Sequence, residues 1–196
     1  MSKSYDITTR AVVVARTQAG EGSARIFLYT EHAGLVGAFA KSVREERSKL
    51  RVFLQVGSYG TYTLVRGERD WRVVGATDVR NAHFELHDRL PLQRSVARVI
   101  ALVRQLVHGE DQNPELFQAL FALFEALPEL PLEGAQTAER LAVLRVLAAL
   151  GYVPAGLSIP HVATVSYSPD VLADVVPFER ELVKTINAAL LASNLV

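Results

Sequence analysis

The residues of this chain best suited to chemistry are cations, and five of them fall within residues 41–51. They are Lys41, Arg44, Arg47, Lys49 and Arg51, and Arg25, Arg66, Arg69 and Arg72 lie on the flanking segments. A groove that holds a single nucleic-acid strand needs cations along a surface of strands and loops, so that they can follow the phosphates. This set therefore predicts a nucleic-acid-binding surface.

Aromatic side chains on which bases can stack are the second requirement of such a groove. Tyr59, Tyr62 and Trp71 are possible stacking platforms. The alternative is that these rings fill the interior of a barrel, and the pattern by itself favours this alternative. The cations therefore carry more of the prediction than the rings do.

Charge divides unevenly along the chain although the whole has no net charge. Residues 1–80 contain 13 Lys and Arg against 8 Asp and Glu, whereas residues 81–196 contain 8 against 13. A basic front half can attract a polyanion while an acidic rear half limits indiscriminate binding. Two solvated surfaces of opposite sign are the alternative.

The front half must place these cations on strands. Residues 5–13 alternate between apolar and polar side chains, which is typical of a strand with one face toward a core. Gly34 can take the backbone conformation that a tight hairpin needs, and Gly57 and Gly60 allow a strand to bend. The predicted strands are residues 5–13, 25–30, 35–40, 52–66 and 71–79. Five strands joined by short turns predict a small closed antiparallel barrel.

After residue 81 the apolar period changes to that of helices. Asn113 and Pro114 are an N-cap and a first helical residue, and the remaining helices have similar start and stop signals. The predicted helices are residues 91–108, a segment from 114 to about 127, residues 137–150 and residues 177–193. The fold class is therefore α+β, with an all-β domain over residues 1–80, an all-α domain over residues 81–196, and an extended loop near residues 152–170.

Signals for catalysis or metal binding are weak. The stretch from Gly20 to Arg25 begins like a dinucleotide fingerprint, but it lacks the third glycine and precedes a strand. His83 and His87 have no evident third ligand. The chain contains no cysteine, which excludes disulfides and thiolate metal sites. We therefore predict that the protein is not an enzyme.

Targeting and membrane signals are equally weak. The apolar run at residues 11–15 is too short for a signal peptide. Residues 146–169 carry no charge, but Pro154 and Pro160 argue against a span through lipid. These features predict a cytoplasmic protein that has no membrane partner, and the predicted nucleic-acid-binding surface would associate it with the nucleoid.

Several short motifs together resemble the bacterial RecO recombination and DNA-repair family. The first set is Gly20-Glu21-Gly22-Ser23, Arg25-Ile26, Tyr29-Thr30, Ala40-Lys41 and Leu50-Arg51, which is similar to the N-terminal part of that family. The second set is Asn113-Pro114-Glu115-Leu116-Phe117 and Leu150-Gly151-Tyr152, which is similar to its helical part. The resemblance spans most of the chain.

The resemblance implies that the barrel is an OB-fold and that the protein mediates DNA repair and homologous recombination. Such a mediator binds single- and double-stranded DNA, anneals complementary strands, and helps to load recombinase with RecR on DNA coated by single-stranded-DNA-binding protein (SSB). The implied partners are DNA, RecR and the C-terminal tail of SSB. The predicted nucleic-acid-binding residues are Arg25, Lys41, Arg44, Arg47, Lys49, Arg51, Arg66 and Arg69. Arg140 and Arg145 are candidates for the tail carboxylate, although an arginine on a helix more often extends into solvent.

The chain also departs from the family pattern. Many members carry a four-cysteine zinc site after the third helix, but residues 152–169 contain no cysteine, so we predict no metal and no cofactor. Ser42 stands where a glycine is usual, and Gln55-Val56 replaces a Gln-Pro pair. Two alternatives remain open: a protein-binding adaptor built on the same barrel, and an RNA-binding OB-fold protein without annealing activity.

Overall fold

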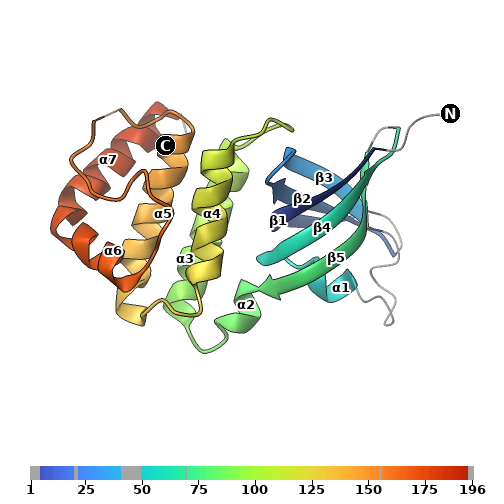
Figure 1. Cartoon of the computed structure of the whole chain (residues 1–196), viewed down its shortest axis with the longest axis horizontal. Coiled ribbons are helices and arrows are strands. Elements are labelled where there is room, and N and C mark those ends of the chain that lie inside the picture. Colours follow the sequence, from blue (N-terminus) through green and yellow to red (C-terminus); the bar gives the residue numbers. More distant parts are fainter. Residues whose placement is uncertain (1–4, 20–21, 41–49, 69, 155, 194–196) are drawn as a thin grey trace. The chain divides into compact units, whose positions relative to one another are not determined.

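The computed structural model describes residues 5–19, 22–40, 50–68, 70–154 and 156–193. The chain forms two compact units, a barrel unit of Met1–Ala82 with Val107–Gln112 and a helical unit of His83–Leu106 with Asn113–Val196. Figure 1 shows the strands of the first and the helices of the second. The predicted fold class, a five-stranded barrel followed by helices, is confirmed. The predicted domains divided the chain at residue 80, whereas in the structure Val107–Gln112 also packs with the barrel.

The barrel is closed in the order β1-β2-β3-β5-β4. Its strands are β1 Tyr5–Gln18, β2 Ala24–Thr30, β3 Gly34–Ala40, β4 Ser58–Arg66 and β5 Trp71–Asn81. Four of the pairings are antiparallel, but β3 and β5 pair in parallel through Ala38–Trp71 and Phe39–Arg72. The prediction of a wholly antiparallel barrel was therefore wrong for the β3–β5 pair. The chain passes through α1 and β4 after β3, so β5 enters the gap in the same direction as β3.

Alternation along the strands separates an apolar interior from a mixed exterior. In β2 and β3 every second residue is buried, and small side chains such as Ala24, Ala38 and Ala40 fit where the barrel is narrow. Larger side chains, including Ile26 and Leu28, fill the rest of the core. Of the intervening residues, Tyr29 is buried, but Arg25 is exposed and Phe27 and Phe39 are partly exposed, so these two strands can present side chains to a ligand.

The predicted strand over residues 52–66 is wrong in its first part. Leu50–Phe53 is instead a short helix, α1, and the strand begins at Ser58. Leu54, which follows α1, is fully buried in the barrel core. The predicted bend at Gly60 is confirmed by a shift of register between Tyr59 and Thr61. A side chain at Gly60 would meet the Asp78 carbonyl oxygen at 2.7 Å, so the close approach of β5 requires a glycine.

Strand β1 extends beyond its predicted end at residue 13 because it pairs with two strands. Its first part pairs with β4 and its second part with β2, and the register shifts between Val13 and Ala15. A bulge of this kind increases the local twist, which turns the strand from one neighbour to the other. The extension brings Arg16 into the barrel wall.

The helical unit is built around α5. Its helices are α2 Ala82–Glu85, which starts at the unit boundary, α3 Leu90–Leu106, α4 Pro114–Ala126, α5 Ala135–Ala149, α6 Pro169–Val175 and α7 Glu179–Ala192. Helix α5 contacts α3, α4 and α7, and buried residues therefore occur on most of its sides. Within the described ranges no helix is long and apolar enough to cross a membrane.

Capping residues define two helix starts in this unit. The Asn113 side chain accepts a hydrogen bond from the Leu116 N–H, which confirms the predicted start of α4. Ser168 caps α6 in the same way through the Val171 N–H. Helix α6 was missed, because the sequence prediction placed residues 152–170 in one extended loop and did not use Ser168-Pro169 as a start signal.

Candidate nucleic-acid interface

The outer side of strands β2 and β3 carries one cation between two aromatic rings. The Arg25 guanidinium lies 5.4 Å from the centroid of the Phe27 ring and 5.7 Å from that of Phe39. Gly37 lies opposite Phe27, and a Cβ there would come within 3.3 Å of the Arg25 side chain. The missing side chain leaves room for Arg25 to lie across the strands. We call Arg25, Phe27 and Phe39 the β2–β3 face.

Arg72 extends this face onto β5, because it lies directly opposite Phe39 in the parallel pairing. A shallow hollow of about 540 Å³ borders the face there. It is lined by Ala19 and Ser23 from the β1–β2 connection, by Gly67, Glu68 and Asp70 from the β4–β5 connection, and by Phe39 and Arg72. Strands 2 and 3 and these two connections are where OB-folds bind oligonucleotides.

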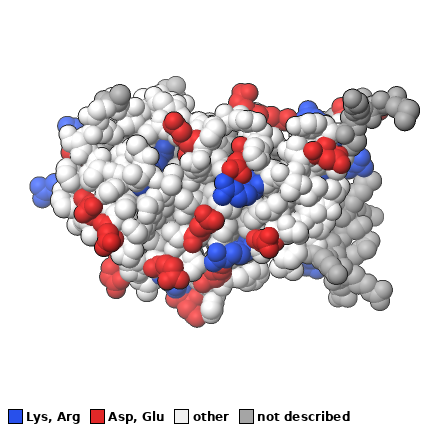
Figure 2. Space-filling model, in the orientation of Figure 1, with Lys and Arg blue, Asp and Glu red and all other residues white. Residues whose placement is uncertain are grey.

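Charges of both signs meet at this hollow. Arg25 and Asp70 approach to 3.9 Å, and both side chains are close to half exposed, so the attraction between them is weak. Glu68 and Asp70 would repel a phosphate placed next to them. Figure 2 shows basic and acidic side chains interspersed over the visible face of the described residues. A phosphate on the β2–β3 face is therefore expected to contact Arg25 and Arg72 from the side away from these acids.

Arg16 is a cation of the barrel wall that the sequence prediction did not include. Partial burial and, to a lesser extent, the charge of Arg51 lower the pKa of Arg16 from its usual value. Arg51 was predicted as a binding residue, whereas Arg16 was missed because the strand was expected to end at residue 13. A prediction that continued this strand past residue 13 would have placed Arg16 in the barrel wall.

Arg66, a predicted binding residue, already forms an ion pair with Glu110. Its Nη1 donates to both carboxylate oxygens of Glu110, at 2.7 and 2.6 Å. The Trp71 Nε1–H donates to the same carboxylate at 3.1 Å. Trp71 also lies under the Arg66 guanidinium, with 5.0 Å between the guanidinium and the ring centroid. Arg66 is therefore not free to bind a phosphate while Glu110 stays in place.

Several predicted site residues lie outside the described residues, namely Lys41, Arg44, Arg47, Lys49 and Arg69. Of the predicted aromatic platforms, Tyr59, Tyr62 and Trp71 are only 2%, 0% and 5% exposed. Tyr62 and Trp71 belong to the barrel core, which is the alternative that the sequence favoured for these rings, and Tyr59 is buried as well. Phe27 and Phe39 are the partly exposed aromatic residues of the β2–β3 face, and the signal for them was their outward position in the alternation of β2 and β3.

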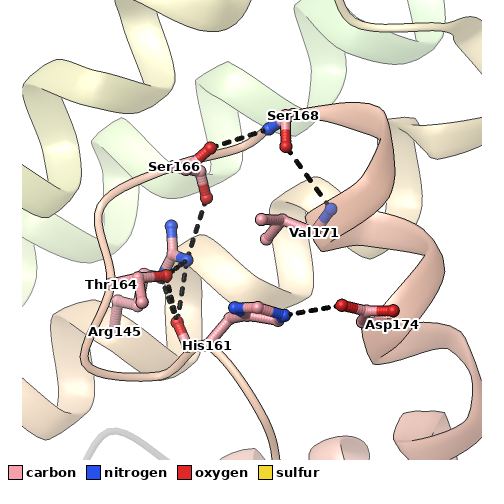
Figure 3. Close-up of polar contacts among 7 residues, drawn as sticks. All are labelled: Arg145, His161, Thr164, Ser166, Ser168, Val171 and Asp174. Carbon is pink, nitrogen blue, oxygen red and sulfur yellow. Dashed lines mark hydrogen bonds and ion pairs between the residues drawn. The ribbon is translucent and has the colours of Figure 1, made fainter.

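Arg145, a candidate for binding the SSB tail, is 2% exposed and holds a loop of its own chain (Figure 3). Its Nη2 donates to the carbonyl oxygens of His161 and Ser166, at 2.8 and 2.9 Å, and to the Thr164 hydroxyl at 3.1 Å. Its guanidinium lies 4.4 Å from the centroid of the Tyr167 ring. The loop therefore depends on an arginine that has no access to solvent.

Arg140, the other candidate, forms an ion pair with Glu179 at the start of α7. Arg140 and Arg145 are five positions apart on α5, which separates them by roughly 140° around the helix axis. The structure therefore does not bring the two together. Arg145 alone borders a cavity of about 700 Å³ in the helical unit, whose apolar lining includes Ala148, Ala149, Val153, Leu157 and Ile159.

Comparison with known families gives two matches in chain order. The family model described as "Recombination protein O N terminal" matches residues 1–79, and the one described as "Recombination protein O C terminal" matches residues 95–156. The first match covers almost the whole barrel, and the second covers most of α3 and all of α4 and α5.

The chain belongs to the RecO family.

Relatives in this family carry the name DNA repair protein RecO. The protein of Dehalococcoides mccartyi strain CBDB1 is 30% identical over 159 residues, which are 79% of this chain and 60% of the relative. That of strain 195 is 33% identical over 127 residues, 65% of this chain and 50% of the relative. That of Salinibacter ruber is 27% identical over 118 residues, 60% of this chain and 45% of the relative. The chain thus spans about half the length of these RecO relatives.

Metal-binding groups do not add to this picture. In the described parts of the chain, no three His, Asp or Glu side chains cluster closely enough to hold a metal ion. The absence of a metal and of catalysis stays a prediction.

Proposed function

We propose that this chain acts in DNA repair and recombination by binding DNA on its barrel. The observation that carries the proposal is the β2–β3 face, on which a cation and two partly exposed aromatic rings lie together on the strands that OB-folds use for binding. Membership of the RecO family supports the choice of DNA as the ligand. The basic stretch at residues 41–51 would extend the surface along the phosphates.

The proposed action involves no covalent chemistry. Arginines and lysines of the barrel neutralise the phosphates of one strand, and Phe27 and Phe39 stack against its bases. Neutralisation lowers the repulsion that a complementary strand meets, so pairing of the two strands becomes faster. In this proposal RecR and SSB are the protein partners that bring the chain to DNA and use the annealed or exposed strand.

A salt titration tests the proposal directly. Binding of fluorescent single- and double-stranded DNA is measured by anisotropy between low and physiological salt, together with annealing of complementary strands. If about four phosphates are neutralised, the logarithm of affinity for a single strand should fall with the logarithm of salt with a slope near −3, at roughly 0.7 per phosphate. Binding that is absent at every salt concentration would favour the protein-binding adaptor, and equal or tighter binding of RNA would favour the RNA-binding alternative.

A charge-reversal variant locates the surface. Replacing Arg44, Arg47 and Lys49 by Glu should weaken DNA binding about 100-fold at low salt and reduce annealing, because three phosphate contacts become repulsions. The control is Arg94, Arg104 and Arg180 replaced by Glu, which makes the same change of charge on exposed positions of the helical unit. An equal loss in both variants would show a general effect of net charge and would refute the barrel as the binding surface.

We further propose that an apolar peptide ending in a carboxylate, such as the SSB tail, docks on the helical unit. The observation that favours this is the apolar cavity bordered by Arg145. Anisotropy with a labelled tail peptide compares the wild type with Arg140→Glu and with Ala148→Phe, which fills the cavity. Loss in the second variant alone supports the cavity, loss in the first alone supports the surface around Arg140, and loss in neither refutes docking at both places.

A further inference from the structure

We propose that Arg66 and Trp71 form a latent phosphodiester site on the barrel, and that the Glu110 carboxylate occupies this site until a nucleic acid displaces it. The inference rests on the proposed function and adds a regulated subsite to it. It assigns to Glu110 the role of an internal competitor of phosphate.

The arrangement of donors is the first reason. A charged guanidinium nitrogen and a neutral indole N–H converge on one carboxylate, at 2.6 to 3.1 Å. The Trp71 ring lies under the guanidinium and limits its orientations. A phosphodiester presents two non-bridging oxygens that share a negative charge, so it can accept the same hydrogen bonds in place of the carboxylate.

The way in which Glu110 is held is the second reason. Its segment, Val107–Gln112, is bound to the barrel by contacts that do not use the Glu110 side chain. The Leu35 N–H donates to the Gly109 carbonyl oxygen at 3.0 Å, and the Gln112 side chain donates to the His32 carbonyl oxygen. Gly34 lies so close to Asp111 that a Cβ would meet its carbonyl oxygen at 2.3 Å. The side chain of Glu110 can therefore swing away while its backbone stays bound.

Exposure is the third reason. The Arg66 and Glu110 side chains are 40% and 46% exposed, so a strand can reach the pair from solvent. Exposed ion pairs are weak and are screened by salt. A nucleic acid that already contacts other cations of the barrel competes well with one exposed carboxylate. Its next phosphate reaches Arg66 within the same complex, so the effective concentration of phosphate there is high.

The experiment uses Glu110→Gln, which keeps the size of the side chain and removes its charge. We expect the affinity of the full chain for single-stranded DNA to rise about threefold to fivefold at low salt, which is the factor that an exposed ion pair is worth. Combining Glu110→Gln with Arg66→Ala should abolish this gain. The matched control is Asp78→Asn, which makes the same charge change at an exposed position of β5 that does not line the hollow, and it leaves the Glu110 contacts in place.

Trp71 supplies an independent readout because it is the only tryptophan in the sequence. We expect an oligothymidylate to change the Trp71 emission of the wild type, since the indole N–H exchanges a carboxylate for a phosphate. In Glu110→Gln the emission of the free protein should already differ from that of the wild type, whereas Asp78→Asn should match the wild type.

The outcomes separate this inference from the proposed function. DNA binding that is unchanged in Glu110→Gln, with no change of Trp71 emission in the wild-type complex, overturns the latent site and leaves DNA binding by the barrel intact. A gain that persists in the double variant, or that Asp78→Asn reproduces, also overturns it, because the gain then reflects net charge. No binding of DNA by any variant refutes the proposed function itself.

Discussion

Arg25 and Arg66 on the barrel differ sharply from Arg145 in the helical unit. The Arg25 and Arg66 side chains are 45% and 40% exposed, and the acids that they contact, Asp70 and Glu110, are themselves 42% and 46% exposed. In the helical unit, Arg145 is 2% exposed and donates to carbonyl and hydroxyl oxygens of one loop. The first group can exchange its partners for a ligand, whereas Arg145 cannot do so without loss of structure.

The difference follows from the elements that carry these residues. A strand of a small barrel has one side in the core and one side in solvent, so an outward arginine stays accessible. Helix α5 is covered by α3, α4 and α7, and an arginine on it must find hydrogen-bond acceptors inside the protein. Exposure therefore distinguishes arginines that a ligand can reach from arginines that support the fold.

Among the variants that test this comparison, Arg145→Met is expected to have the largest effect, which is on the free energy of unfolding. The substitution keeps an apolar chain but removes the donors for the His161 and Ser166 carbonyl oxygens and the Thr164 hydroxyl. A hydrogen bond from a charged group contributes about 1.5 to 3 kcal/mol, and the Arg145 Nη2 alone makes three to this loop, so the free energy of unfolding should fall by about 3 kcal/mol or more. Urea denaturation followed by circular dichroism measures it.

Arg180→Met is the control for this variant, because Arg180 is exposed on α7. We expect it to change the free energy of unfolding by less than about 0.5 kcal/mol. If Arg145→Met were as harmless as the control, the loop would be held by other contacts and the contrast between the two units would fail.

A substitution of Arg25 on the barrel is expected to have a smaller effect, and to change DNA binding instead of stability. Arg25→Ala removes one phosphate contact from the β2–β3 face, so affinity for single-stranded DNA should fall about fivefold to tenfold at low salt, and the salt slope should become shallower by about 0.7. The melting temperature should stay within a few degrees of the wild type, because Arg25 lies outside the core. Anisotropy across salt and thermal denaturation measure the two quantities.

The matched control for Arg25→Ala is Arg104→Ala, an exposed arginine on α3. It should leave both the affinity and the salt slope unchanged. Equal losses in the two variants would mean that DNA contacts the helical unit as much as the barrel, and the division of roles would then be wrong.

The smallest effect concerns the Arg10–Glu31 ion pair on the barrel. The hydrogen bond from Arg10 is the main cause that lowers the pKa of Glu31 below 4.5. Because the pKa is lowered in the folded state, the pair stabilises the protein above about pH 4.5, and this contribution is lost as the pH falls through the folded-state pKa. Glu31→Gln should therefore reduce the free energy of unfolding by about 0.3 to 1 kcal/mol at pH 7.

By pH 3 the difference between Glu31→Gln and the wild type should have shrunk markedly, and denaturation at both pH values measures it. Glu129→Gln, at an exposed position of the helical unit, should match the wild type at both. A difference that is constant with pH would show that the pair does not act through the charge of Glu31.

Particular residues show how far sequence patterns reach. Two short apolar segments on either side of a turn at Gly34 predicted β2 and β3 to within a residue of their observed bounds, since a hairpin can be recognised in consecutive residues. Sequence patterns also placed residues 52–57 in a strand, which was wrong. Consecutive residues do not show that Leu54 is buried in the barrel core. Arg145 was counted as a ligand-binding candidate because nothing local indicates that α5 is covered on most sides.

The sequence by itself determined the fold class, the change from strands to helices after residue 81, and the family. These depend on periodicity, turn residues and short motifs, all of which can be recognised in consecutive residues. Only the tertiary structure decided which charges are available. Glu110 lies 44 residues from Arg66 and occupies it, and the loop beyond residue 160 surrounds Arg145. Pairing and burial depend on distances between segments that are remote in the chain, and such distances are fixed only when the chain folds.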